Sequence, residues 1–326
     1  MEAKCCNGQM LSLEDVQEAR RRVGDLVRRT PIERNETLSR KLGTNVYLKY
    51  ELFQKTGSFK PRGAFNTMLA MSDEQRAAGV VGVSGGNFAQ GMAYAGMTLG
   101  VDTLVLMPES TPQNYVDATR GYGAVVEFEP TIDTLFAAAE ERASAGRTLM
   151  HPFDHPDMMA GNGTVGLEIV EDVPEVTDVF VSVGGGGLLS GVVTAVRRLN
   201  SDTRVWAVET EGADVLSRSL VSSEQIRMSP TSRAKTLGSP YAAQTAIDLS
   251  AQLAAPPIVV SDAAAFAALK TLMERAKVSP ELAASCTLAA AETVSDRFSN
   301  DDHVVLLLCG GNISIADIAE MENAFG

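Results

Sequence analysis

The chain has 326 residues, of which 45% are hydrophobic and 21% are charged, a composition typical of a globular protein with one large or two medium cores. Its formal net charge of −13 argues against a surface for nucleic acid or for an anionic membrane. No apolar run approaches the roughly 18 residues that span a bilayer, and the N-terminal residues lack the basic and then apolar pattern of a secretion signal. We therefore expect a cytoplasmic protein.

The cysteines and histidines show no pattern of a metal centre or of a disulfide framework. Cysteine occurs at Cys5, Cys6, Cys286 and Cys309, and histidine at His151, His155 and His303. Two of the cysteines are adjacent near the N-terminus and the others lie far apart, so we expect reduced thiols. The histidines fit no ligand spacing and no catalytic triad, and we expect them to have structural roles.

The first predicted helix begins at a capping box of Ser12 and Asp15 and ends before residue 30. Residues 45–51 alternate and are rich in β-formers, which predicts a strand. A second helix is predicted over residues 59–71.

That second helix follows directly on a turn, with Ser58 as the expected N-cap and Pro61 in its first turn. Lys60 is thereby placed at the mouth of a strand-to-helix junction. Taken alone, Lys60 is better explained as a solvated lysine than as a functional one. Arg62, two residues further on, is compatible with an anchor of this loop or with a charge on the helix surface.

From residue 80 onward, apolar strand-like segments alternate with helical ones, which predicts parallel α/β structure. A first series has strands at 80–84, 102–107, 124–128 and 148–150, and helices at 88–99, 112–122 and 131–145. A second series has helices at 165–170, 188–199, 213–220, 263–277, 281–298 and 313–324, and strands at 178–183, 204–209, 258–261 and 303–309. The polar residues 221–237 are expected to form a surface loop.

A run of four glycines separates one apolar strand from the helix that follows it. The run consists of Gly184, Gly185, Gly186 and Gly187, followed by Leu188. Glycines here allow several backbone N–H groups to converge on an anion at a helix N-terminus, which indicates a cup for one phosphate. The spacing matches neither the dinucleotide fingerprint nor the P-loop. A flexible strand-to-helix turn is the alternative.

A second glycine-rich loop also ends a strand and opens a helix. It consists of Ser84, Gly85, Gly86, Asn87 and Phe88. Its amides and hydroxyl suit a carboxylate, and its Asn supplies an orienting amide. A third small-residue loop, at residues 308–312, closes the last strand. A junction lysine, a phosphate cup and a carboxylate cup together imply a phosphorylated aldehyde cofactor, held as a Schiff base, that meets an amino acid.

At this point the chain resembles the fold-type II pyridoxal-phosphate enzymes, within them the serine/threonine dehydratase and serine racemase group, from about residue 13 to residue 319. The resemblance rests on Ser-Phe-Lys-x-Arg-Gly-Ala around Lys60, on the tetraglycine loop, on the Ser-x-Gly-Asn loop and on the Gly-Gly-Asn near the C-terminus. It implies an α/β fold like the tryptophan synthase β subunit, with two open, twisted, mainly parallel sheets flanked by helices.

The resemblance also implies roles for individual residues. Lys60, preceded by Phe59, holds pyridoxal phosphate, the tetraglycine loop through Leu188 holds its phosphate, and Cys309 faces the pyridine nitrogen. The loop at Ser84 takes the substrate carboxylate, and Asn87 contacts the 3-oxygen of the cofactor.

The implied reaction is β-elimination of an L-β-hydroxy amino acid, L-threonine or L-serine, to a 2-oxo acid and ammonia, with the Lys60 amine as the base for the Cα proton. We expect a large cofactor-binding domain of residues 1–68 and 158–326, a small inserted domain of residues 69–157, and a homodimer.

Departures from the family pattern leave alternatives open. In the racemases, a serine at the position of Gly85 delivers a proton to the opposite face of Cα, so racemase activity is expected to be weak or absent. Phe88 replaces a common His. Together with the missing side chain at Gly85 it predicts a pocket for a bulkier substrate such as L-threo-3-phenylserine. A phosphate-ligand binding protein without catalysis is a third alternative.

A cation site is left open as well. The family holds a divalent cation with Glu, a backbone carbonyl of Ala and Asp; Glu209 and Ala213 match, but Val215 replaces the Asp. Glu211 or Asp214 can compensate, or these carboxylates form a solvated helix start. The sequence therefore leaves a divalent cation, a monovalent cation or none.

One further carboxylate is unassigned. Ser279 replaces the usual Glu before a proline, which leaves Glu281 nearby, and whether Glu281 reaches the site stays open.

Overall fold

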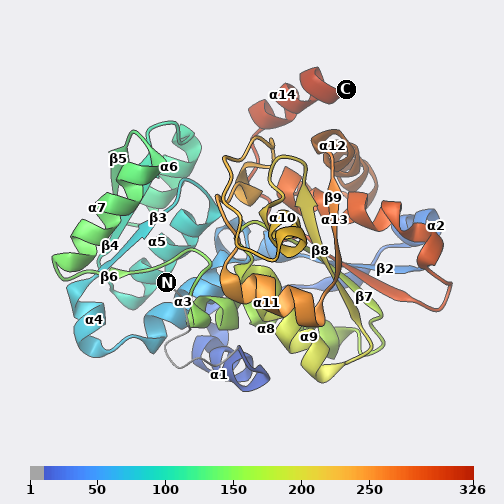
Figure 1. Cartoon of the computed structure of the whole chain (residues 1–326), viewed down its shortest axis with the longest axis horizontal. Coiled ribbons are helices and arrows are strands. Elements are labelled where there is room, and N and C mark those ends of the chain that lie inside the picture. Colours follow the sequence, from blue (N-terminus) through green and yellow to red (C-terminus); the bar gives the residue numbers. More distant parts are fainter. Residues whose placement is uncertain (1–10) are drawn as a thin grey trace.

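The computed structural model describes residues 11–326, except for the side chains of residues 132 and 133. Two separate sheets lie side by side (Figure 1). The larger sheet has the order β1-β2-β10-β7-β8-β9 and the smaller one the order β5-β4-β3-β6. All neighbouring strands run parallel except β1 and β2. The predicted α/β fold with two mainly parallel sheets is therefore confirmed.

The larger sheet contains β1 (Ile32–Arg34), β2 (Asn45–Lys49), β7 (Asp178–Ser182), β8 (Arg204–Thr210), β9 (Ala255–Val260) and β10 (His303–Leu307). The smaller sheet contains β3 (Val80–Val83), β4 (Thr103–Pro108), β5 (Val125–Glu129) and β6 (Thr148–Leu149). The helices of the smaller lobe are α4 (Asp73–Ala78), α5 (Asn87–Leu99), α6 (Gln113–Gly121) and α7 (Ile132–Ser144). The other helices are α1 (Leu13–Val23), α2 (Glu36–Leu42), α3 (Lys60–Ala70), α8 (Pro156–Asp172), α9 (Gly187–Leu199), α10 (Val215–Ser222), α11 (Gln244–Leu253), α12 (Asp262–Thr271), α13 (Leu282–Thr293) and α14 (Ile315–Phe325).

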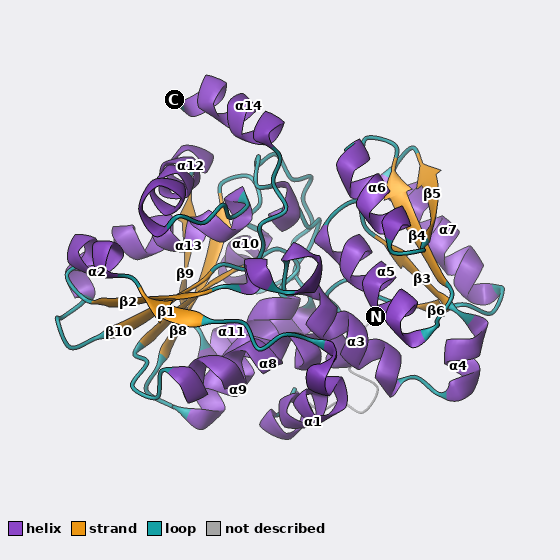
Figure 2. Ribbon diagram, turned by 180° about the vertical axis from the view of Figure 1, so that it is seen from behind, coloured by secondary structure: helices purple, strands orange, loops and turns teal. Residues whose placement is uncertain are grey.

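Helices cover both faces of the larger sheet, as Figure 2 shows. Val179 and Val181 of β7 pack into the apolar cluster that includes α8, α9 and α11. The intervening Phe180 packs into the cluster on the other face, which includes α12 and α13. Alternate residues of one strand thus serve two cores, because side chains in a strand point to opposite faces.

Four short elements, β1, α2, α4 and α11, were not expected from the sequence pattern. In addition, α8 is 17 residues long, whereas the sequence predicted a helix only at 165–170. The glycines of α8 obscure the helical pattern of apolar residues, and they allow neighbouring helices to pack closely against α8. At Gly163, for example, a Cβ would lie only 2.8 Å from the carbonyl oxygen of Gly191 in α9.

Two predicted helices end earlier than their patterns suggested. α12 passes into a π-helical turn at residues 272–276, and α13 is followed by a short 3₁₀ turn at residues 295–297. The predicted cap of α3 is also wrong. Phe59 is the N-cap of α3, while Ser58 is extended and forms a β-bridge with Gly310. Pro61 lies in the first turn as expected.

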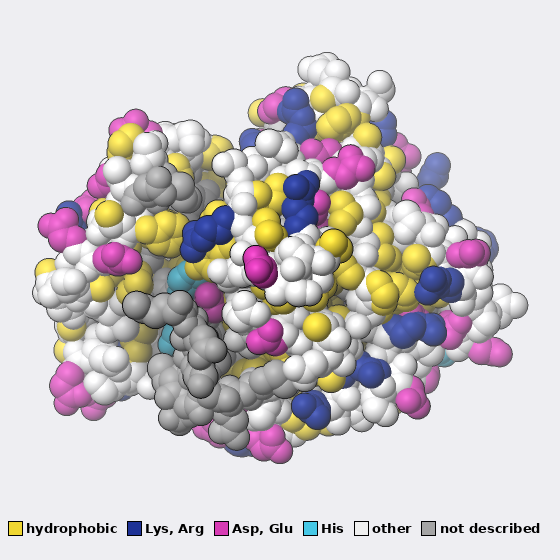
Figure 3. All heavy atoms as spheres, viewed as in Figure 1, with side chains coloured by type: hydrophobic (Ala, Val, Ile, Leu, Met, Phe, Trp, Pro, Cys, Tyr) yellow, Lys and Arg dark blue, Asp and Glu magenta, His cyan; other side chains and the backbone are white. Residues whose placement is uncertain are grey.

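The surface in Figure 3 carries Lys or Arg and Asp or Glu side chains interspersed, without a large patch of one sign on that face. None of the helices within residues 11–326 has both the length and the apolar character needed to cross a bilayer.

A buried ionic network joins the N-terminal part of the larger lobe to α3 and α8. Arg62 is fully buried, and its guanidinium donates to Glu51 at 2.8 Å and to Glu168 at 2.7 Å. Lys49 donates to Glu168 at 2.6 Å. Of the two choices left open for Arg62, the charge on the helix surface is wrong, because the side chain is fully buried. The anchoring role agrees with the structure. It ties the start of α3 to the core.

We expect Glu168→Ala to lower the free energy of unfolding by about 3–5 kcal/mol, because it leaves two buried cations without their shared partner. Chemical denaturation of the cofactor-free protein measures this. The matched control is Glu127→Ala, whose carboxylate forms an exposed pair with Arg142 at 3.1 Å and is expected to change stability by about 0.5 kcal/mol or less. Equal effects for the two variants would contradict the role assigned to the network.

Candidate active site

Lys60 is held in place by contacts between its own loop and the loop after the last strand. The N–H of Phe59 donates to the carbonyl of Cys309 at 3.1 Å, and the N–H of Gly311 donates to the carbonyl of Gly57 at 2.9 Å. These two loops are about 250 residues apart in the chain. Their pairing brings the first residue of α3 next to the carboxyl end of β10, where parallel α/β folds place their ligands.

The amine of Lys60 is partly buried among apolar and neutral groups. Its Nζ donates to the carbonyl of Pro152 at 3.2 Å, and it lies 4.9 Å from the ring centre of Phe59. Burial lowers the pKa of Lys60 to about 8, while Cys309 and Glu281 act in the opposite direction. About a tenth of the amine is therefore neutral, and nucleophilic, at pH 7, far more than for a lysine with the ordinary pKa.

The four glycines form the turn between β7 and α9. Gly186 has a φ of +89° and is the N-cap of α9, so the first N–H groups of this helix have no acceptor within it. Side chains could not replace these glycines. A Cβ at Gly185 would overlap the ring of Phe153, and one at Gly187 would lie 2.8 Å from the carbonyl oxygen of Phe153. The turn is therefore shaped to bring free N–H groups close to a small anion.

The second loop has the same construction at the start of α5. α5 begins at Asn87, so the N–H groups of Asn87 and Phe88 also lack intrahelical acceptors. The N–H of Gly86 is bound by the hydroxyl of Ser84 at 3.1 Å. The side chain of Asn87 points across to the larger lobe, where its amide donates to both oxygens of Glu281 at 3.0 Å.

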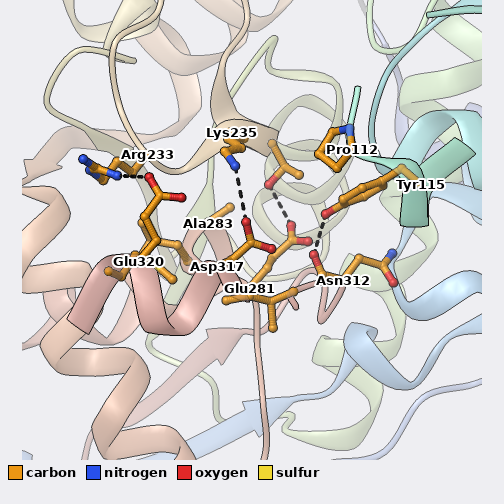
Figure 4. A pocket seen from close by; sticks show the side chains of 13 residues that line it. Pro112, Tyr115, Arg233, Lys235, Glu281, Ala283, Asn312, Asp317 and Glu320 are labelled. Carbon is orange, nitrogen blue, oxygen red and sulfur yellow. Dashed lines mark hydrogen bonds and ion pairs between the residues drawn. The ribbon is translucent and has the colours of Figure 1, made fainter. Parts of the chain in front are cut away.

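Glu281 does reach the site. It is 5% exposed and accepts hydrogen bonds from Asn87 and, at 2.8 Å, from the hydroxyl of Thr236. Burial raises the pKa of Glu281, against the opposing effect of these hydrogen bonds and of Lys60. Figure 4 shows its carboxylate in a cavity whose wall also includes Tyr115 and Asn312.

Asn312 connects three segments around this carboxylate, a role that the sequence did not reveal. Its amide nitrogen donates to the carbonyl of Thr56 at 2.9 Å and to Oδ1 of Asn87 at 2.7 Å. Its carbonyl accepts from the hydroxyl of Tyr115 at 2.5 Å. The only signal in the sequence was its position after two glycines at the end of a strand.

The thiols near the site are free and buried, as the sequence predicted for Cys286 and Cys309. Cys5 and Cys6 lie outside the described residues. Burial raises the pKa of Cys309 well above its usual value, and the carboxylate of Glu281 raises it further. Cys309 therefore presents a neutral thiol at the end of β10.

Comparisons with known proteins agree with this geometry. Residues 23–310 match the family model described as "Pyridoxal-phosphate dependent enzyme". The chain belongs to this family.

Among its relatives, the L-threonine ammonia-lyase of Thermotoga maritima is 37% identical over 96% of this chain and 79% of that protein. The catabolic L-threonine dehydratase of Staphylococcus aureus is 34% identical over 95% of this chain and 91% of that protein. Maize serine racemase has a similar solved structure, with a TM-score of 0.91, 29% identity and coverage of 97% of this chain and 98% of that one.

The residues present fit pyridoxal phosphate, the cofactor of this family. The free N–H groups at the start of α9 suit its phosphate, and the amine of Lys60 suits its aldehyde. The thiol of Cys309, neutral at physiological pH, is available for the ring nitrogen. These assignments, like that of Asn87 to the 3-oxygen, stay predictions of the sequence that the geometry allows.

Of the three histidines, His151 directly precedes Pro152, whose carbonyl accepts from the amine of Lys60. Its Nδ1 accepts from the N–H of Asp154 at 2.8 Å, and its Nε2 lies 3.0 Å from the hydroxyl of Tyr241. Burial lowers the pKa of His151 to about 4, so the ring is neutral and, with Nδ1 an acceptor, its Nε2 carries the proton. His155 caps α8 and His303 contacts Tyr47, which agrees with structural roles for both.

Gly85 and Phe88 lie beside Thr111 and Lys60, respectively. The ring of Phe88 is only 2% exposed, packs with Val80 and Met92, and has its centre 5.8 Å from Nζ of Lys60. The space beside Gly85 is occupied by Thr111, whose hydroxyl would lie 2.6 Å from a Cβ at position 85. A side chain at position 85 would therefore need Thr111 to move, while the pocket for a bulkier substrate stays a prediction.

Of the acidic residues near β8, Glu211 is exposed and Asp214 is the N-cap of α10, as a solvated helix start requires, whereas Glu209 is not solvated. Glu209 is fully buried and accepts hydrogen bonds from the N–H groups of Leu216 and Ser217 at 2.8 Å. Burial raises the pKa of Glu209 to about 7. Val215 is buried in the apolar core. Within residues 11–326 no three His, Cys, Asp or Glu side chains cluster as metal ligands, and a cation held by Glu209 and Ala213 stays a prediction.

We expect uptake of pyridoxal phosphate by the cofactor-free chain to accelerate as pH rises, with a midpoint near pH 8. The neutral amine is the reactive form, and a lowered pKa makes this form predominant above pH 8 rather than above pH 10. The rate is followed by the visible absorbance of the bound cofactor. Glu281→Gln is expected to move the midpoint to lower pH, because the carboxylate raises the pKa of Lys60. A midpoint at pH 10 would contradict the assignment.

Proposed function

We propose that this enzyme catalyses the β-elimination of an L-β-hydroxy amino acid, L-threonine or L-serine, to a 2-oxo acid and ammonia. The observation that carries the proposal is the place of the Lys60 amine, whose pKa is about 8. It lies 5.8 Å from the ring of Phe88 at the start of α5 and donates to Pro152, whose neighbour Phe153 packs against Gly185 and Gly187 before α9. The names of the relatives in Thermotoga maritima and Staphylococcus aureus support this choice of substrate.

When bound, pyridoxal phosphate supplies an electron-accepting ring that stabilises negative charge at the substrate Cα. The chain's own residues supply the rest. The loop at Ser84 holds the substrate carboxylate, which orients the Cα–H bond. The amine of Lys60 removes the Cα proton as a general base, a role for which a pKa of about 8 is suitable.

The neutral groups around Lys60 direct the outcome. The thiol of Cys309, with its raised pKa, is neutral and cannot keep the ring nitrogen protonated as a carboxylate would. We expect this to limit the stabilisation of charge by the ring and to favour loss of the β-hydroxyl over transamination. The β-hydroxyl leaves as water with a proton that balances the one removed from Cα by Lys60. The released enamine tautomerises to an imine, and addition of water to it gives ammonia and the 2-oxo acid.

A panel of L-serine, L-threonine and both diastereomers of 3-phenylserine, scored by 2-oxo acid formation, tests the substrate. We expect L-threonine or L-serine to be preferred, in agreement with the names of the relatives in Thermotoga maritima and Staphylococcus aureus. Preference for 3-phenylserine would instead support the alternative drawn from the sequence.

We expect Lys60→Ala to reduce turnover at least about 100-fold, because the base that removes the Cα proton is lost. The control Lys41→Ala, a change on the surface of α2, is expected to leave turnover unchanged.

The same substrate panel separates this proposal from a binding protein without catalysis, since a binding protein would form no 2-oxo acid from any of the substrates. Racemisation is separated by measuring inversion and elimination together in deuterated water. If inversion at Cα were as fast as elimination, the expectation of weak racemase activity would be wrong. That expectation rests on the missing serine hydroxyl at Gly85.

We also propose that the enzyme is a cytoplasmic homodimer, as the family resemblance implies. The free, buried thiols of Cys286 and Cys309 are compatible with a reducing compartment. Light scattering coupled to size-exclusion chromatography measures the mass, for which a dimer of the 34.6 kDa chain is expected.

A further inference from the structure

Thr111 lies against the loop that is proposed to bind the substrate carboxylate. A Cβ at Gly85 would be 2.6 Å from Oγ1 of Thr111 and 3.3 Å from Cδ of Pro108. Gly85 has no positive φ, so its backbone conformation does not demand glycine. Glycine is required there because the hydroxyl of Thr111 occupies the place of a side chain.

The hydroxyl of Thr111 has no hydrogen-bond partner among the described residues. Thr111 is partly exposed, but its Oγ1 is buried from solvent. A buried hydroxyl without a partner is unfavourable, and such groups in native proteins call for an explanation. The position is not a loose one, since the N–H of Thr111 donates to the carbonyl of Pro108 at 2.9 Å and closes a turn between β4 and α6.

The groups beside this hydroxyl are donors for an anion. α5 starts at Asn87, so the N–H groups of Asn87 and Phe88 point out of the helix without acceptors, and Gly85 directly precedes them in the loop. The next residue after Thr111, Pro112, lines the cavity that contains Glu281 (Figure 4). An acceptor bound at this loop would thus meet a hydroxyl donor on the side where Gly85 has no side chain.

We propose that Thr111 is a substrate-binding residue whose hydroxyl donates a hydrogen bond to the carboxylate of the amino acid held at Gly85–Phe88. The hydroxyl takes the place that a side chain at position 85 would fill, so the donor comes from the turn after β4 instead of from the loop itself. The inference rests on the proposed function, which identifies the ligand as an amino acid.

Two substitutions separate the hydroxyl from the shape of the side chain. Thr111→Val keeps the shape and removes the hydroxyl, and Thr111→Ser keeps the hydroxyl and removes a methyl group. The ligand for the binding measurement is L-alanine, which has the carboxylate but no β-hydroxyl to lose. Its binding is followed by the change in cofactor absorbance of the loaded enzyme.

For Thr111→Val we expect L-alanine to bind about 10- to 100-fold more weakly, and KM for L-threonine and L-serine to rise by a similar factor with a smaller change in kcat, as expected for loss of a hydrogen bond to a charged group. Thr111→Ser is expected to stay within about threefold of the wild type, because the charged hydrogen bond is retained. The melting temperature of cofactor-free Thr111→Val is expected to be unchanged or higher, because an unpaired buried hydroxyl is removed.

Three results would overturn the proposal. One is unchanged L-alanine binding in Thr111→Val. Another is a higher KM that is confined to L-threonine and L-serine. That result would show that the hydroxyl of Thr111 contacts the β-hydroxyl of the substrate instead of its carboxylate. A third is a melting temperature lowered by several degrees, which would show a structural role. Failure of the proposed function is distinguishable, since it appears as absence of 2-oxo acid formation by the wild-type enzyme and leaves the L-alanine measurement interpretable.

Discussion

The position of Lys60 depends on a guanidinium two residues away that is completely buried. Arg62 is bound by Glu51 and Glu168, and Glu168 also binds Lys49. Such a network costs desolvation free energy, and it is stable only with every partner present. It joins the end of β2, the start of α3 and the middle of α8, three segments that the chain reaches at widely separated points. The amine of Lys60 therefore belongs to the first residue of α3, and the first turn of this helix cannot shift without breaking buried ion pairs.

Around that amine, burial has opposite effects on acids and bases. It lowers the pKa of Lys60 to about 8 and that of His151 to about 4, and it raises the pKa of Glu281 and of Cys309. All four shifts favour the neutral form of each group, because the surroundings solvate charge poorly. The proposed anion sites instead use backbone N–H groups at the starts of α5 and α9, which need no counter-charge in the side chains. Such sites are compatible with a chain whose formal net charge is −13.

Most of the fold and part of the site could be predicted because they depend on local patterns. The strand and helix alternation, the two glycine loops and the junction at Lys60 each occur within a few consecutive residues. Glu281 and Asn312 could not be placed in the same way. Asn87 meets Glu281 across 194 positions of sequence, and Asn312 meets Thr56 across 256. Thr111 gave no signal in the sequence, because its proposed role depends on its contact with Gly85 in the folded chain.

The sequence by itself determined the class of chemistry, since a lysine at a helix start and two glycine-rich strand-to-helix turns have backbone requirements that local sequence satisfies. Only the tertiary structure decided the environment of these groups. Whether Lys60 is neutral, whether Glu281 lies in the cavity and whether Gly85 leaves space all depend on which distant side chains are packed against them. Burial and close approach are properties of the folded chain, and a local pattern cannot contain them.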